Sequence, residues 1–153
     1  MEVRKCTVAE LESASTFAQL LDEYAAEVHV DGAPHPSAKM EMYRQLESLG
    51  TLTAFGAFLD NVLIGFISVL TSELPHFGRM FAVTESFFVS KEHRGTGAGL
   101  KLLSEAEKLA AGLGVPGILV SAPYGGQLAK VLSLRPGYIE TNRVFFKKLN
   151  HVE

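Results

Sequence analysis

Short runs of alternating apolar and polar residues, and longer runs with apolar residues every three or four positions, divide the chain into predicted strands and helices. In the first third these are a strand over Glu2–Thr7, a helix from Val8 to about His29, a turn over Val30–Pro36 and a helix over Ser37–Leu49. Thr7, three residues before Glu10, has the spacing of a hydroxyl cap at a helix start. Gly50 follows the second helix, where a left-handed residue commonly ends a helix.

The rest of the chain alternates strands with helices. Asp60-Asn61 is suited to a tight hairpin turn between two strands. The run Phe87-Phe88-Val89 places apolar side chains on both faces of a third strand, as expected for a strand that is covered on both sides. The predicted elements are strands over Thr51–Leu59, Val62–Leu70 and Met80–Val89, a helix over Gly99–Leu113, a strand over Gly117–Ser121, a helix over Gln127–Leu134 and a last strand or hairpin over Tyr138–Leu149. With no repeat, linker or low-complexity tract, the order indicates one domain over residues 1–153.

Composition narrows the function classes. The 153 residues are 47% hydrophobic and 20% charged, a balance that fits a globular core and excludes disorder. The net charge of −3 gives no electrostatic reason to expect a nucleic acid or a membrane surface as partner. Cys6 is the single cysteine, so we expect a core thiol in a reducing, cytoplasmic setting. No apolar run approaches the roughly 18 residues of a spanning helix, and the first residues lack a signal-peptide pattern.

A glycine-rich turn joins an apolar strand to a strong helix in the sequence Arg94-Gly95-Thr96-Gly97-Ala98-Gly99. Glycines let backbone N–H groups point into one concavity, and the helix start adds partial positive charge, so the turn suits a phosphate or pyrophosphate. A dinucleotide-binding fingerprint would need a glycine where Leu100 stands, and no ATP-type phosphate loop occurs. The segment therefore predicts an anion pocket of another kind.

This turn resembles the acetyl-CoA pyrophosphate loop of the GNAT superfamily of N-acetyltransferases, whose pattern is Arg/Gln-x-x-Gly-x-Gly/Ala between a central strand and a helix. The similarity extends to Val89 before the loop, Leu102-Leu103 in the helix, Gly137-Tyr138 before the last strand, and the order of elements along nearly the whole chain. It implies a mixed α/β fold with a largely antiparallel central sheet. It also implies acetyl transfer from acetyl-CoA to a primary amine in a ternary complex, the acceptor being a small polyamine, amino acid or antibiotic, or a protein amine.

The resemblance assigns roles on the donor side. The pyrophosphate would be bound by the amides of Arg94, Gly95, Thr96, Gly97, Ala98, Gly99 and Leu100. Phe88 and Val89 would pair with the pantetheine arm, and the N–H of Val89 would stabilise the oxyanion. Glu85, four residues before Val89 and expected on the same strand face, is the candidate base for the amine proton. An ion pair between this glutamate and an arginine is an equally weighted interpretation.

The sequence departs from the family pattern at the general acid. Relatives commonly carry a tyrosine four residues before the Gly-aromatic pair and an asparagine seven residues before that tyrosine, where this chain has Ser133 and Gly126. Tyr124, Tyr138 and Ser133 are the candidate substitutes. Because a thiol of pKa about 8.5 leaves reasonably well as thiolate, we expect reduced dependence on a general acid.

The acceptor side is built in relatives from the first two helices, their connector and the late hairpin. The candidate substrate residues are Tyr24, Glu27, His29 and Tyr43, with Asp31, His35 and the loop at His76 nearby. These histidines and acids lack regular ligand spacing, so no metal site is predicted. The missing tyrosine and asparagine motivate an alternative, a CoA-binding sensor without turnover. A nucleotide-binding regulator is a third hypothesis, and a homodimer is a family-level expectation.

Overall fold

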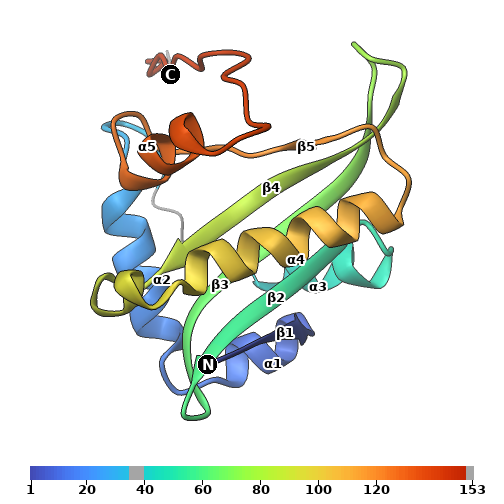
Figure 1. Ribbon diagram of the computed structural model, residues 1–153. Coiled ribbons are helices and arrows are strands. Elements are labelled where there is room, and N and C mark those ends of the chain that lie inside the picture. The colour runs from blue at the N-terminus through green and yellow to red at the C-terminus, as the bar shows by residue number, and fades with distance from the viewer. Residues whose placement is uncertain (35–39, 151–153) are drawn as a thin grey trace.

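A five-stranded sheet forms the centre of the computed structural model, which describes residues 1–34 and 40–150. The elements are β1 (Glu2–Cys6), α1 (Val8–Ser13), α2 (Phe17–Glu27), α3 (Met40–Ser48), β2 (Leu52–Leu59), β3 (Val62–Leu74), β4 (Arg79–Val89), the 3₁₀ helix η1 (Lys91–Thr96), α4 (Ala98–Gly112), β5 (Ile118–Leu119) and α5 (Gln127–Leu134). The strands lie in the order β1-β2-β3-β4-β5, antiparallel except for the parallel β4–β5 pair (Figure 1). The expected mixed α/β fold with a largely antiparallel sheet is confirmed.

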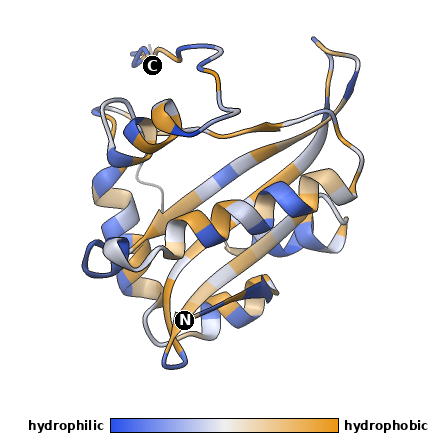
Figure 2. Cartoon of the chain, viewed as in Figure 1, coloured by the Kyte–Doolittle hydropathy of each residue, from blue (hydrophilic) through white to orange (hydrophobic). Residues whose placement is uncertain are grey.

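Both faces of the sheet are covered. Helix α4 lies across one face (Figure 1). There, Leu102 and Ala106 belong to the same buried cluster as Val89 of β4. The opposite face packs against α1 and α2, and there Phe88 lies beside Phe66 and Tyr24. Figure 2 shows many apolar residues along β2, β3 and β4, and apolar residues alternating with polar ones along α4. Phe88 and Val89 therefore enter opposite cores, which confirms the expectation that this strand is covered on both sides.

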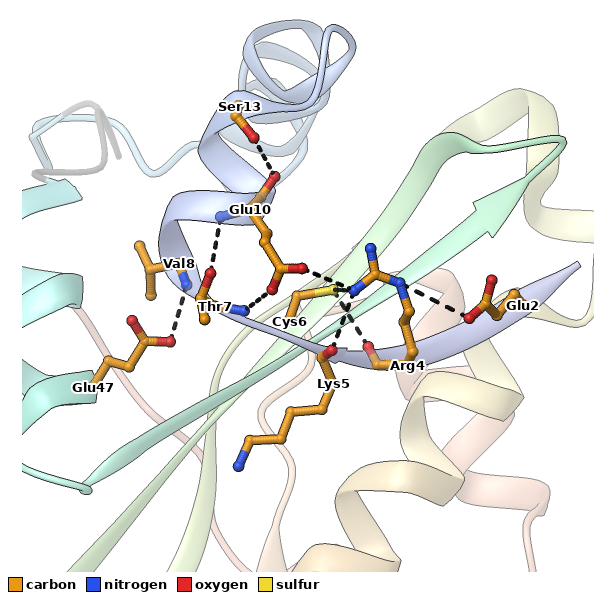
Figure 3. A network of polar contacts seen from close by, with 9 residues as sticks. All are labelled: Glu2, Arg4, Lys5, Cys6, Thr7, Val8, Glu10, Ser13 and Glu47. Carbon is orange, nitrogen blue, oxygen red and sulfur yellow. Dashed lines mark hydrogen bonds and ion pairs between the residues drawn. The ribbon is translucent and has the colours of Figure 1, made fainter.

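The predicted helix cap is present at the start of α1. The Oγ1 atom of Thr7 accepts from the Glu10 amide at 3.1 Å, and Oε2 of Glu10 accepts from the Thr7 amide at 2.7 Å (Figure 3). The carboxylate of Glu47, on α3, accepts from the Val8 amide at 3.0 Å. Each bond satisfies an amide that the first helical turn leaves without a carbonyl partner, and the last one ties α3 to α1.

The prediction of one helix from Val8 to about His29 is wrong, because the chain leaves the helix between α1 and α2. Ala14 is extended, with ψ of 132°, and the Thr16 hydroxyl donates to the Leu63 carbonyl on β3 at 2.7 Å. The Ser13 hydroxyl donates to the Glu10 carbonyl at 2.9 Å. Hydroxyl side chains compete with helical backbone bonding, and here they end α1 although the apolar spacing continues.

The hairpin and helix-ending signals are confirmed. Asp60 and Asn61 have φ of 50° and 64°, the left-handed pair that a two-residue hairpin turn needs, and Gly50 has φ of 74° after α3. β3 extends to Leu74, beyond the predicted end at Leu70. The predicted start of the α3 helix at Ser37 lies outside the described residues. The Cys6 side chain is buried, as predicted, and burial raises the pKa of its thiol.

The predicted last strand or hairpin over Tyr138–Leu149 does not form, because residues 138–150 adopt no regular secondary structure. β5 is also shorter than the predicted Gly117–Ser121, with only two residues in the sheet. A strand needs a neighbouring edge to pair with, and so short an edge offers almost none.

Within residues 1–34 and 40–150, no helix is long and apolar enough to cross a membrane.

Candidate active site

β4 and β5 are paired over only two positions, and beyond them a cavity opens. Ala82 pairs with Ile118 and Val83 with Leu119, and the Ser121 amide then donates to Oγ1 of Thr84 at 3.1 Å. The cavity that follows has a volume of about 250 Å³. It is lined from α2 by Tyr24, Glu27 and Val28, from β4 by Thr84, Glu85, Ser86, Phe87 and Phe88, and from the C-terminal third by Ser121, Ala122, Pro123 and Leu128. The second half of β4 thus has an edge that β5 does not cover.

Glu85 is the extra residue of a β-bulge. Val69 of β3 pairs with Thr84, and Ser68 pairs with Ser86, so Glu85 has no residue opposite. A bulge shifts the alternation of side chains along its strand. The carboxylate consequently lies on the face of the sheet that α1, α2 and α3 cover, whereas Val89 packs in the α4 core. The expectation that Glu85 and Val89 share a strand face is therefore wrong.

Two hydroxyl groups hold the Glu85 carboxylate. Tyr43 donates its phenol proton to Oε1 at 2.7 Å, and Ser68 donates to Oε2 at 3.0 Å. Ser68 and Ser86 are 2.6 Å apart at their Oγ atoms. Burial, followed by the contact with Glu85, raises the pKa of Tyr43 well above its ordinary value, so this phenol stays a donor. Among the described residues the partners of Glu85 are hydroxyls, not the arginine of the alternative interpretation.

Tyr24 lies close to the same carboxylate. Its ring contacts the Phe88 ring edge-on, with centroids 5.9 Å apart, and it lines the cavity beside Glu85. Burial first, and then the negative charge of Glu85, raise the pKa of Tyr24. The cavity therefore holds a carboxylate next to a phenol that is neutral at ordinary pH.

The backbone at the end of β4 faces the uncovered side. The Ser90 amide donates to the Ile64 carbonyl on β3 at 3.0 Å. Backbone N–H groups alternate in direction along a strand, so the N–H of Val89 points the other way, towards the side that β5 has left. The Val89 carbonyl accepts from Nε of Arg94 at 3.1 Å, consistent with that direction. Val89 itself is buried and does not line the cavity, whereas Phe88 does.

The glycine turn forms η1 and the first turn of α4. Gly97 is the residue before α4 and has φ of 81°, a left-handed conformation that side chains disfavour. A Cβ atom at Gly95 or Gly97 would meet no heavy atom of residues 1–34 and 40–150 within 4 Å, so these residues leave open space in front of both. The amides of Gly99 and Leu100 have no helical carbonyl to bond, and they stand at the positive end of the α4 dipole. This arrangement can bind an anionic group with backbone amides.

The three candidate general acids do not meet at the cavity. The Tyr124 side chain is fully exposed, and the exposed Ser133 hydroxyl donates to the Ala129 carbonyl of its own helix at 2.8 Å. Tyr138 donates to Glu107 of α4 at 2.7 Å, and burial together with this bond raises its pKa. None of them lines the cavity.

The acceptor candidates divide into two groups. Tyr24 and Glu27 line the cavity, and Tyr43 reaches Glu85 from α3. His29 is exposed beyond the end of α2, and His76 stacks edge-on with Phe77 in the β3–β4 connection; neither lines the cavity. His35 lies outside the described residues. Ser68 and Ser86, both buried, were not among the predicted site residues, although a hydroxyl inside an apolar strand is a signal that the sequence contains.

Solved structures with a similar fold are acetyltransferases. An aminoglycoside acetyltransferase, meta-AAC0020, from an uncultured soil metagenomic sample, is 19% identical with a TM-score of 0.72, covering 97% of this chain and 96% of that one. AAC(6')-Iy in complex with the bisubstrate analogue CoA-S-monomethyl-acetylneamine is 18% identical with a TM-score of 0.69, covering 97% of each chain. The ribosomal-protein-alanine N-acetyltransferase of Brucella melitensis biovar Abortus 2308 is 19% identical with a TM-score of 0.67, covering 96% of this chain and 100% of that one. At such identities the likeness shows the fold alone.

The amino-acid sequence was also compared with curated protein sequences and with models of protein families. No curated protein sequence matches the chain. The model of the acetyltransferase (GNAT) family matches residues 16–125, which include α2, the bulge at Glu85 and the glycine turn. Because that match covers more than half of the chain, the protein belongs to the acetyltransferase (GNAT) family.

Proposed function

We propose that this protein transfers an acetyl group from acetyl-CoA to a primary amine of a small cationic molecule. The observation that carries the proposal is the cavity beside the uncovered edge of β4, with the Glu85 carboxylate held at the bulge by two hydroxyls. In this proposal the amides of the loop from Arg94 to Leu100 bind the pyrophosphate. The pantetheine arm pairs with Phe88 and Val89 as an added strand.

The chemistry needs a neutral amine and a stabilised oxyanion. An alkylammonium has a pKa of about 10, so a proton must leave before the nitrogen attacks. Glu85 accepts that proton, directly or through water, while the N–H of Val89 donates to the oxyanion. The carbon–nitrogen bond forms, the carbon–sulfur bond breaks, and CoA leaves as thiolate, while the nitrogen loses a second proton to solvent to give the neutral amide.

Departure of the thiolate needs no dedicated side chain in this proposal. A thiolate of conjugate pKa about 8.5 is a reasonable leaving group and can be protonated by solvent. The positions of Tyr124, Ser133 and Tyr138 away from the cavity support this. If no side chain protonates the thiolate, a plot of the transfer rate against pH should show no descending limb between about pH 8 and 9.5. A steep limb that Tyr124→Phe abolishes would contradict it.

The acceptor is a small cation because the cavity is small and the Glu85 carboxylate that lines it accepts hydrogen bonds from hydroxyl groups among the described residues. The solved relatives named above include enzymes that act on aminoglycosides and one whose name specifies a ribosomal protein alanine. A cavity of about 250 Å³ favours a small molecule or the terminal amine of a chain over a folded protein surface.

The test is release of free thiol from acetyl-CoA with a panel of polyamines, amino acids, aminoglycosides and an alanine-ended peptide. We expect amine-dependent release by the wild type and a loss in kcat of about 10²-fold in Glu85→Gln. Glu73→Gln changes an exposed glutamate on β3 and is the matched control. Tight acetyl-CoA binding with no release for any amine would favour the sensor alternative.

A further inference from the structure

Arg94, the first residue of the glycine turn, directs its side chain away from that turn. Its guanidinium has three partners: the Glu27 carboxylate of α2 through an ion pair, the Val89 carbonyl at 3.1 Å from Nε, and the Phe88 ring, whose centroid is 5.4 Å from Cζ. All three lie where α2 meets the end of β4. The Arg94 side chain thus connects α2, which carries the acceptor candidates Tyr24 and Glu27, to the end of β4, where the pantetheine arm is proposed to bind.

Glu27 contributes to this bridge from the cavity wall. Its side chain is 29% exposed and that of Arg94 is 32% exposed, so the ion pair is only partly screened by water. One helical turn earlier, Glu23 accepts from the Lys91 amide at 3.4 Å. Two carboxylates of α2, those of Glu23 and Glu27, therefore bind Lys91 and Arg94 of η1, which leads into the glycine turn.

We infer that Glu27 is a positioning residue for the acetyl-CoA donor site and acts through Arg94, rather than a contact for the acceptor amine. The inference rests on the proposed function, in which amides of the loop bind the pyrophosphate. Backbone amides bind an anion well only when they are already aligned, and ordering a loose loop on binding lowers the affinity. The Glu27 charge keeps Arg94 on the Val89 carbonyl and so keeps the strand end and the loop aligned.

Titration calorimetry with acetyl-CoA tests this in the wild type, Glu27→Gln, Arg94→Gln and the double variant. We expect each single variant to bind at least about fivefold more weakly and the double variant to bind no more weakly than Arg94→Gln, because Glu27 acts only through Arg94 in this inference. Asp22→Asn, an exposed acid on the same helix, is the matched control and should bind within about 1.5-fold of the wild type. In steady-state assays KM for acetyl-CoA should rise in Glu27→Gln, while KM for the amine changes less than about twofold.

Wild-type affinity in both single variants would overturn the inference. So would additive losses in the double variant, or a rise of the amine KM with an unchanged acetyl-CoA KM in Glu27→Gln. Thermal melts of the same samples separate misfolding from weaker binding, and Arg94→Gln gives the same comparison should Glu27→Gln fold poorly. An absence of acetyl-CoA binding by the wild type is a different result, since it would reject the proposed function itself.

Discussion

At the scale of single residues, Glu85 differs from the strand residues around it because the bulge leaves it without a residue opposite. Among the described residues, its negative charge is balanced by hydrogen bonds from Tyr43 and Ser68 rather than by a cation. A carboxylate bonded only to neutral donors keeps a lone pair for a proton from the cavity side. Hydroxyl partners thus suit a base better than an ion pair would.

The hydrogen bond from Tyr43 predicts a pH-dependent stability. The pKa of this phenol is raised in the folded state above the unfolded value of about 10, so its contribution is fully present below about pH 10 and is lost as the pH rises further. Tyr43→Phe should therefore lower the free energy of unfolding by about 1 kcal/mol at pH 8 and by less at pH 11. Urea melts at the two pH values measure this, with Tyr124→Phe, a fully exposed tyrosine, as the control. Equal effects of Tyr43→Phe at both values would contradict the assignment.

Glu85 was chosen as the candidate base from the resemblance to the GNAT family, in which many members place an acid four residues before the position of Val89. That choice did not include the environment of its carboxylate. The strand face was predicted wrongly, because the bulge depends on how β3 pairs with β4. Ser68 and Tyr43 come from other elements, and nothing in the spacing along the chain brings them to Glu85.

At the scale of elements, the connection between η1 and α4 contains two glycines, Gly95 and Gly97, whose replacement by alanine should affect stability differently. Gly95 has an ordinary φ and open space, so Gly95→Ala should leave the unfolding free energy within about 0.5 kcal/mol while weakening acetyl-CoA binding about tenfold by intruding on the loop. Gly97 has φ of 81°, so Gly97→Ala should also lose about 1 kcal/mol of stability. Thermal melts and calorimetry on the same samples measure both quantities.

Gly112, the last residue of α4, is the control for these glycines. In the part of the chain that the structure describes, no heavy atom lies within 4 Å of a Cβ atom placed there, and the position is far along the helix from the loop. Gly112→Ala should preserve acetyl-CoA binding and leave stability unchanged or slightly improved. Unchanged binding in both Gly95→Ala and Gly97→Ala would count against anion binding by the loop.

Elements that depend on local signals were predicted well. The hairpin at Asp60-Asn61, the Thr7 cap and α5 over Gln127–Leu134 all agree with the structure. The break between α1 and α2 and the missing strand over Tyr138–Leu149 could not be predicted in this way. The first depends on the Leu63 carbonyl of β3, and the second depends on the length of edge that β5 offers.

At the scale of the whole molecule, the proposed donor site joins parts that the sequence keeps far apart. The cavity is lined by residues of α2, the second half of β4 and the segment after β5. The glycine turn leads from the end of β4 into α4 (Figure 1). A ligand that contacts these parts together stabilises the folded chain as a unit, by an amount that grows with its concentration relative to Kd. Binding of acetyl-CoA should therefore be visible as a shift of global unfolding.

The most direct test of the account is calorimetric titration of the wild-type chain with acetyl-CoA, with a thermal melt of the saturated sample. We expect one saturable site and, at about 100 times Kd, a gain of about 2.7 kcal/mol in unfolding free energy. ATP and NAD should bind more weakly, because the turn lacks their loop patterns. A folded sample that shows neither heat nor thermal protection with acetyl-CoA, or that prefers ATP or NAD, would contradict the account.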